Sequence, residues 1–191
     1  AVVGTRDAYE HRVDFVKKIA HKLVKMDKTV VSGLAHGVDA AAHKGALEAG
    51  GRTTAVLPGD VQTIRPSGNE SLAKKIRNRG ALVGELTDRK TIHKGRFVER
   101  NRLISGISSA VVIGASGETG GTIHQANFAK EQGKPRFLYE SKKDDGQSPN
   151  KLYNKGFISF ETVEEMERLI QQKFEPASSV SERPSTLDDF Q

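Results

Sequence analysis

The stretch from Val30 to Gly51 constrains the fold of this chain more than any other. Two valines end a short apolar run, Ser32-Gly33 breaks it, and apolar residues then recur at helical spacing until Gly50-Gly51 closes the segment. A strand, a glycine-bearing turn and a helix in this order predict one unit of an α/β fold. Such a turn points backbone N–H groups at one place, where an anion could be held.

The same alternation runs along most of the chain. Periodicity predicts strands near residues 1–3, 29–32, 53–57, 81–86, 110–114, 135–139 and 157–160, and helices near 9–25, 37–49, 69–79, 97–107, 122–132 and 162–172. We therefore expect an α/β domain over residues 1–174, with an open, mostly parallel sheet and helices on both faces. Residues 175–191 are rich in Ser, Pro and acids, which predicts a flexible acidic tail.

Composition excludes several classes of protein. The chain has no Cys, so a disulfide framework and a thiolate metal site are excluded. No apolar run reaches the roughly 20 residues that span a bilayer, and no secretory signal is recognisable, so we expect a cytoplasmic protein without membrane contact. The sequence opens without Met inside a predicted strand, and we expect it to be part of a longer protein.

Positive charge is concentrated in one block. The whole chain carries +6, yet residues 62–102 alone hold eleven Lys or Arg against four acids. This block favours a polyanionic partner, and Lys74 on the helix 69–79 would add steering charge. The alternative is a solvated basic face. The absence of Trp and the few aromatic residues argue against a large stacking platform for bases.

Three turns should meet at the carboxyl edge of the sheet, where open α/β sheets bind ligands. They are Gly4-Thr5-Arg6, Ser32-Gly33-Leu34 and the segment from Gly114 to Thr122. The third resembles a phosphate loop, with Gly117, Gly120, Gly121 and the helix-capping Thr122. It lacks the lysine of a Walker A loop, and the first turn lacks the spacing of a dinucleotide motif, so we expect no ATP hydrolysis, no NAD and no cofactor. Alternatively, the glycines only make tight turns.

A second cationic constellation begins the helix 97–107. Arg96, Arg100 and Arg102 could pair with phosphates, and Asn101 adds an amide beside them. Phe97 could stack on an unpaired base or be an ordinary core residue.

Metal binding and catalysis have weaker signals. His36, Asp39 and His43 could share one helical face, but no second cluster completes a site, and hydrogen bonds that tie the turn to its helix are an alternative role. No spacing supports Ser32 or Ser105 as a nucleophile. We expect no metal and no catalytic residue.

The motifs together resemble a known family. The stretches 31–51 and 97–108, the Arg65-Pro66 step with Asn69 and Leu72, and the Gly4-Thr5-Arg6 turn are similar, in this order, to motifs of the DNA-processing family DprA, also called Smf. His36, Val98, Arg65 and Gly68 stand where the family usually has other residues. Where the family typically continues into a C-terminal winged helix, we expect an acidic tail after residue 174 here.

The resemblance implies an extended Rossmann domain that binds single-stranded DNA in a basic pocket, forms a homodimer and helps to load a RecA-type recombinase. It implies DNA contact or pocket formation for five residues by position: Arg6, Gly33, Arg100, Asn101 and Arg102.

A rival lies in the same superfamily. Gly120-Gly121-Thr122 is similar to the loop of lysine-decarboxylase-like phosphoribohydrolases, whose glutamate falls at Gln125 here. An amide cannot accept a proton as a carboxylate does, which disfavours hydrolysis and leaves a nucleotide-binding sensor as the alternative function.

The C-terminus carries one further pattern. Its last residues resemble a peptide that binds a sliding clamp, with Leu187 and Phe190 as apolar anchors. The alternative is an ordinary acidic tail.

Overall fold

The computed structural model describes residues 1–85, 92–118, 120–142, 145–148 and 156–174. Its strands are β1 (Val2–Gly4), β2 (Val30–Ser32), β3 (Thr53–Leu57), β4 (Ala81–Gly84), β5 (Val111–Ala115), β6 (Arg136–Tyr139) and β7 (Ile158–Phe160). Its helices are α1 (Glu10–Lys25), α2 (Val38–Glu48), α3 (Glu70–Arg79), α4 (Lys94–Gly106), α5 (Gly121–Glu131) and α7 (Val163–Phe174). Strands and helices alternate along most of the chain, as the sequence predicts.

All strand pairs in the described residues are parallel. Backbone hydrogen bonds join them in the orders β1-β5-β6-β7 and β2-β3-β4. Between β1 and β2 a side chain replaces the backbone ladder, because the buried Ser32 hydroxyl donates to the Val2 carbonyl at 2.7 Å. The sequence does not predict this break in the sheet.

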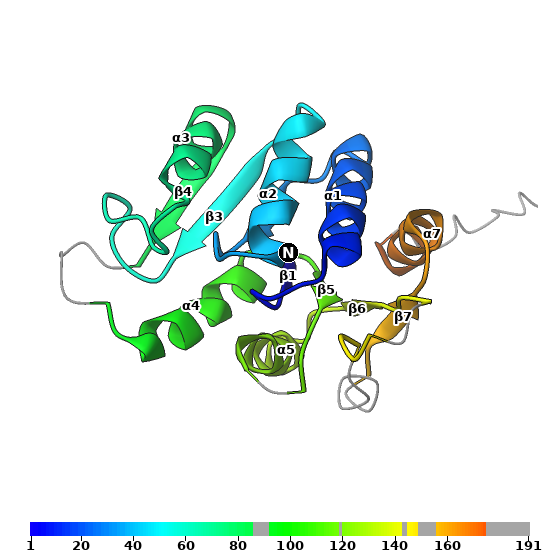
Figure 1. Cartoon of the computed structure of the whole chain (residues 1–191). Coiled ribbons are helices and arrows are strands. Elements are labelled where there is room, and N and C mark those ends of the chain that lie inside the picture. The colour runs from blue at the N-terminus through cyan, green and yellow to red at the C-terminus, as the bar shows by residue number, and fades with distance from the viewer. Residues whose placement is uncertain (86–91, 119, 143–144, 149–155, 175–191) are drawn as a thin grey trace, which may run out of the picture.

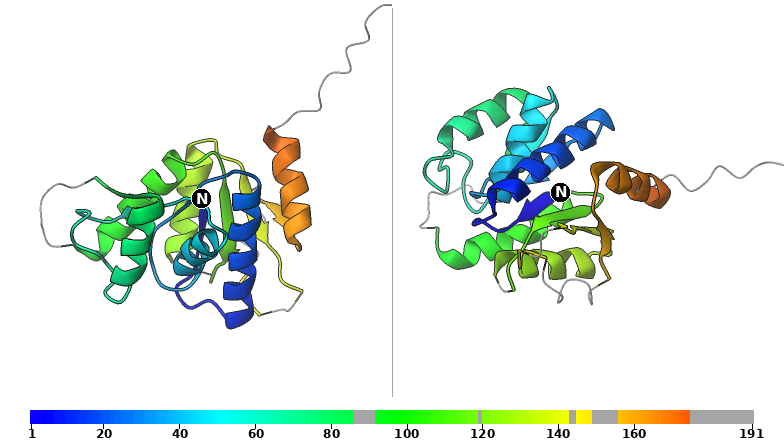
Figure 2. Two further views of the ribbon diagram at one scale, coloured as in Figure 1. Left: turned by 90° about the horizontal axis from the view of Figure 1, so that it is seen from above. Right: turned by 45° about the vertical axis from the view of Figure 1, so that its right-hand side comes forward.

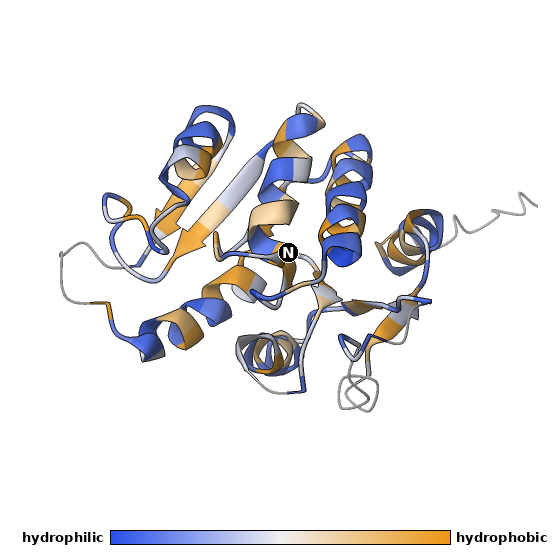
Figure 3. Cartoon of the chain, in the orientation of Figure 1, coloured by the Kyte–Doolittle hydropathy of each residue, from blue (hydrophilic) through white to orange (hydrophobic). Residues whose placement is uncertain are grey.

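Helices cover both faces of the sheet, which confirms the predicted fold class. Figures 1 and 2 show α1, α2, α3 and α7 on one face and α4 and α5 on the other. The first layer buries Val16, Ile19 and Ala20 of α1, and the second buries Ile104 of α4 and Ala126 of α5. Hydrophilic and hydrophobic residues alternate along α1, α3 and α7 in Figure 3, as expected of helices that bury one side.

Two boundaries bear on the predictions. Helix α4 begins at Lys94, three residues before the predicted start, so Arg96 belongs to its first turn instead of a loop. The predicted acidic tail, with Leu187 and Phe190, lies outside the described residues. Among the helices that are described, none combines the length and the apolar character needed to cross a membrane.

Candidate nucleic-acid interface

A pocket of about 450 Å³ opens at the carboxyl ends of β1 and β5. The chain leaves β1 toward β2 on one side, and β5 begins the other half of the strand order. Such a reversal is where open α/β sheets leave a crevice for ligands. Of the predicted site residues, the pocket is lined by Gly4, Thr5, Arg6, Arg100, Asn101, Gly117, Gly120, Gly121 and Thr122. Two of the three predicted turns therefore meet here.

Arg6 and Phe97 form the open side of this pocket. The exposed Arg6 guanidinium lies over the half-buried Phe97 ring, 5.3 Å from its centroid. Lys94, at the start of α4, adds a second accessible cation to the lining. The ring holds a guanidinium at the mouth without neutralising its charge, so Arg6 keeps hydrogen-bond donors for an anion.

The glycine-rich turn also lines the pocket, through Gly117, Gly120 and Gly121. Gly120 has a φ of +110°, a conformation that favours glycine, and α5 begins directly after it at Gly121. The Asn101 side chain holds this turn from α4, because its Nδ2 donates to the Gly121 carbonyl at 3.2 Å. The first N–H groups of a helix have no partner within that helix, and together with the positive end of the helix dipole they make the start of α5 suitable for an anion.

Arg100 takes a different position from Arg6. Its side chain is 6% exposed, and Nη1 donates to the carbonyls of Gly33, at 2.6 Å, and Val56. Burial lowers the pKa of Arg100, the negative charge of Asp39 opposes this, and the positive charge of Arg6 lowers it further. The two positive charges repel each other in the same pocket, and an anion bound near both would offset that repulsion.

Gly33 contributes to the pocket indirectly, by binding Arg100. It does not line the pocket itself, but its carbonyl fixes the guanidinium. The buried Asp39 carboxylate accepts from the Ala35 N–H at 3.3 Å, and burial raises its pKa against the opposing charge of Arg100. Asp39 also lines the pocket, where it is the counter-charge of Arg100.

The remaining predicted cations lie outside the pocket lining. Arg102 is exposed and pairs with Glu85, and Arg96 pairs with Glu99 at 3.2 Å. Lys74 is exposed on α3, which covers the other face of the sheet from α4. None of these three side chains lines the pocket.

The possible metal ligands are kept apart. His36 is exposed, whereas His43 is fully buried, with Nδ1 2.7 Å from the Thr53 hydroxyl. Within the described ranges, no three His, Cys, Asp or Glu residues gather as a metal site. The hydrogen bonds of Asp39 and His43 tie α2 to its surroundings, as the alternative in the sequence analysis proposed.

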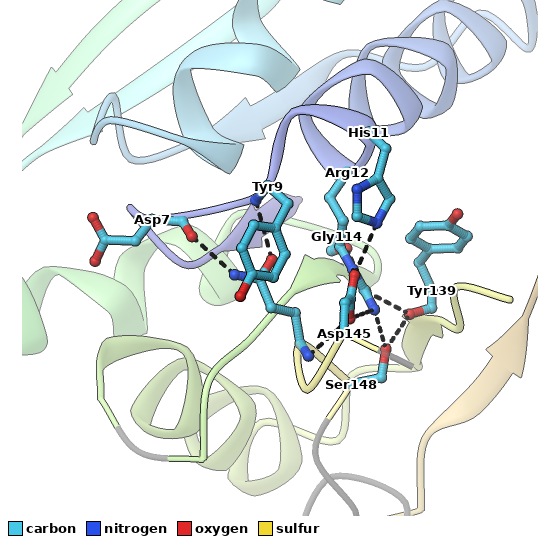
Figure 4. A network of polar contacts seen from close by, with 9 residues as sticks. Asp7, Tyr9, His11, Arg12, Gly114, Tyr139, Asp145 and Ser148 are labelled. Atoms are coloured by element: carbon cyan, nitrogen blue, oxygen red, sulfur yellow. Dashed lines mark hydrogen bonds and ion pairs between the residues drawn. The ribbon is translucent and has the colours of Figure 1, made fainter. Parts of the chain in front are cut away.

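A polar network joins the turns at this edge of the sheet (Figure 4). The buried Arg12 of α1 donates to both oxygens of Asp145, at 2.8 and 2.7 Å, and to the Ser148 hydroxyl at 2.9 Å. Gln147 connects the first turn and the glycine-rich turn, since its Nε2 donates to the Asp7 carbonyl and its own carbonyl accepts from Ser116. Residues 145–148 are therefore hydrogen-bonded to the segments that follow β1 and β5.

Sequence reasoning missed the parts of the site that carry no pattern. Lys94 fell in a segment without period, and Asp145 and Gln147 in a polar loop. Gln125, considered only for the rival hydrolase, lies in the pocket lining and is 2% exposed. Its position four residues after Gly121, one helical turn into α5, was the available signal.

The sequence matches a known protein family over most of its length. Residues 1–171 match the family model for DNA recombination-mediator protein A. Protein Smf from Synechocystis is 38% identical over 130 residues, which cover 68% of this chain and 33% of that protein. The chain spans 33% to 58% of the length of the curated relatives that it matches.

Solved structures agree with this match. DNA processing protein A from Streptococcus pneumoniae has a TM-score of 0.79 and 27% identity, over 87% of this chain and 59% of that one. The Helicobacter pylori protein, described for its single-stranded DNA binding mode, has a TM-score of 0.81 and 25% identity, over 90% of this chain and 79% of that one. By its sequence match and its fold, the chain belongs to the DNA recombination-mediator protein A family, also known as DprA or Smf.

Proposed function

We propose that this chain is a single-stranded DNA-binding domain of DNA processing and recombination, with a non-catalytic role. The observation that carries the proposal is the pocket at the carboxyl edge, which is lined both by Arg6, stacked on Phe97, and by the glycine-rich start of α5. A flexible strand can lay a phosphate between these two walls, whereas the stiff duplex cannot bend into a pocket of this size. The single-stranded DNA binding mode described for the Helicobacter pylori relative supports the same assignment.

We assign different tasks to the predicted residues. Arg6 and Thr5 contact phosphate directly, as do Gly117, Gly120, Gly121 and Thr122 of the glycine-rich turn, with Lys94 beside them. Arg100, Gly33 and Asn101 shape the pocket from below. Lys74, Arg96 and Arg102 add long-range attraction, which speeds association and is weakened by salt.

Hydrolysis in this pocket is disfavoured. A phosphoribohydrolase needs a carboxylate to accept a proton, and the corresponding position here is the neutral amide of Gln125. Glu118 is on the glycine-rich turn but is exposed and outside the pocket lining.

We propose the binding partners of this domain from its membership of the family. As a recombination mediator, the domain would deliver single-stranded DNA to a RecA-type recombinase and act as a homodimer in the cytoplasm. A sliding clamp is a further candidate partner, through Leu187 and Phe190. Pull-down of a purified recombinase or clamp, with and without residues 175–191, separates the two.

The direct test measures binding of fluorescent single strands and matched duplexes by anisotropy across a range of salt concentrations. Wild-type protein should prefer the single strand, and Arg6→Glu should lower that affinity more than about tenfold. The matched control is Arg168→Glu, the same charge change at an exposed site on α7. Equal affinity for both forms, or equal losses in the two variants, would remove the pocket assignment.

A further inference from the structure

Asp39 is a buried carboxylate in the lining of a pocket that otherwise suits an anion. It lies in the first turn of α2, is 6% exposed and lines the same pocket as Arg6 and Arg100. Its Oδ2 accepts a hydrogen bond from the Ala35 N–H at 3.3 Å. A fixed negative charge at this place would repel a phosphate, because like charges interact strongly where water is excluded. Whether Asp39 is charged therefore affects anion binding.

The hydrogen bonds of Arg100 do not depend on the charge of Asp39. Nη1 of Arg100 donates to the backbone carbonyls of Gly33, at 2.6 Å, and Val56. Within the residues that the structure describes, no ion pair or hydrogen bond joins Arg100 to Asp39 directly, and Asp39 acts on it through its charge alone. A proton on Asp39 would leave Arg100 on the same carbonyls, with its positive charge no longer offset.

The charged groups that face Asp39 come from several elements. The lining holds four further charged side chains, two from the turn after β1 and two from α4: Arg6, Asp7, Lys94 and Arg100. On α2, the buried His43 follows one turn after Asp39, and burial lowers the pKa of His43 to about 3, so its ring is neutral above about pH 5. Two exposed histidines, His36 and His93, stand next to lining residues in the sequence.

A bound phosphate changes the proton affinity of Asp39. Burial raises the pKa of Asp39, and the positive charge of Arg100 opposes this. A phosphate in the same pocket offsets that positive charge and adds a negative one, so it raises the pKa further. The carboxyl group therefore holds a proton more tightly in the bound state than in the free state. By linkage, binding strengthens as pH falls between the two pKa values and is independent of pH on either side of them.

We propose that binding of a single strand in this pocket is coupled to a proton on Asp39. The carboxylate takes up one proton from the solvent as a phosphate enters, and returns it as the phosphate leaves. The inference rests on the proposed function, because it needs a phosphate of the strand in the pocket. Ionised, Asp39 is the counter-charge of Arg100; protonated, it leaves the positive charges of Arg6 and Arg100 to the phosphate.

The test measures proton uptake on binding. The probe is an oligothymidylate without a terminal phosphate, because a phosphomonoester itself titrates near about pH 6. Titration calorimetry in buffers of different ionisation enthalpy gives the number of protons bound, from about pH 5 to about pH 8, where folded proteins are usually most stable. Wild type should take up as much as about one proton in this range, and its affinity should rise by up to about tenfold for each unit that pH falls.

Asp39→Asn removes the titrating group with little change of shape. This variant should lose the proton uptake and bind the strand about tenfold more tightly than wild type at the upper end of the range. Asp7→Asn, the same substitution at an exposed position of the lining, should keep the uptake. A variant with both His36→Gln and His93→Gln should keep it as well, because the imidazoles are not its source.

The outcomes separate the inference from the proposed function. Uptake that Asp39→Asn abolishes and the control variants keep supports the inference. Absence of uptake in wild type throughout the range, or its persistence in Asp39→Asn, would overturn the coupling and leave Asp39 as a structural counter-charge. If Asp39→Asn does not fold, the control variants decide, since loss of uptake in either one would assign the proton elsewhere. Unchanged affinity in Arg6→Glu would count against the proposed function itself, because the strand would then lie outside the pocket.

Discussion

A Cβ atom on Gly33 would lie 2.1 Å from Nη1 of Arg100, so these two residues fit together only because one of them has no side chain. The contact joins the turn between β2 and α2 to α4, and α2 and α4 lie on opposite faces of the sheet. It also keeps a cation in the pocket wall while its hydrogen bonds go to backbone carbonyls. The structural and functional roles of Arg100 are therefore linked.

Gly33→Ala should destabilise the domain by about 2–4 kcal/mol, because the buried guanidinium must move and lose charged hydrogen bonds. Chemical denaturation of wild type and variant measures the difference. Gly121→Ala is the matched control, since a Cβ there meets nothing within 4 Å. An unchanged midpoint in Gly33→Ala would show that Arg100 relaxes without cost.

The location of the site could be predicted from sequence because it follows from topology. Strands of one direction bring their carboxyl ends to one edge, so Gly4-Thr5-Arg6 and the turn before Thr122 had to be neighbours. The sequence left Phe97 as either a base-stacking residue or a core residue, and only the structure shows its ring in the pocket lining under Arg6.

Topology does not predict which of the arginine side chains are buried and which are exposed. Arg100 and Arg102 are two positions apart on one helix and so point in different directions, one buried against carbonyls and the other exposed beside Glu85. The bond between Arg12 and Asp145 joins residues 133 positions apart, and the loop that carries Asp145 has no periodicity. Such contacts depend on packing that pattern alone does not specify.

The buried His43 predicts a loss of stability in mild acid. Burial, and then the positive charge of Arg100, lowers the pKa of His43 from 6.5 to about 3. Between about pH 3 and 6.5, His43 therefore binds a proton in the unfolded chain but not in the folded one. As pH falls from about 6.5 toward 3, the free energy of unfolding should drop by up to about 1.4 kcal/mol per pH unit from this group.

His43→Gln should reduce that pH slope, whatever its effect on absolute stability. The measurement is urea unfolding of wild type and variant at several pH values between about 4 and 6.5, a range within the window of about 3 to 6.5 that the pKa change defines. His36→Gln, at an exposed position of the neighbouring turn, is the control. The same slope in His43→Gln and wild type would refute the assignment.

Asp145 predicts a second transition at lower pH. The hydrogen bond from Arg12, with those from Gln147 and His11, lowers the pKa of Asp145 far below its ordinary 3.8. This carboxylate stabilises the fold above about pH 3.8 and loses that effect as pH falls further. Asp145→Asn should cost about 3 kcal/mol at neutral pH, with the difference from wild type shrinking below pH 3.8.

Thermal unfolding at neutral and acid pH tests this prediction. Asp14→Asn removes only an exposed contact with Lys17 at 3.6 Å, so it should change stability by less than about 0.5 kcal/mol. A cost for Asp145→Asn that persists unchanged in acid would mean that the loop is held by contacts other than this ion pair.

The salt dependence of DNA binding should separate Arg6 from Arg102. Arg6 lines the pocket, so Arg6→Gln should weaken binding of a single strand about tenfold and reduce the slope of log affinity against log salt by about 0.7, the value for one phosphate contact. Arg102 lies outside the pocket and pairs with Glu85, so Arg102→Gln should cost less than about threefold. Both variants remove one positive charge, which makes them controls for each other, and anisotropy titrations at several salt concentrations give both quantities. Equal slopes and losses would place the phosphate path along the outer face of α4 and not in the pocket.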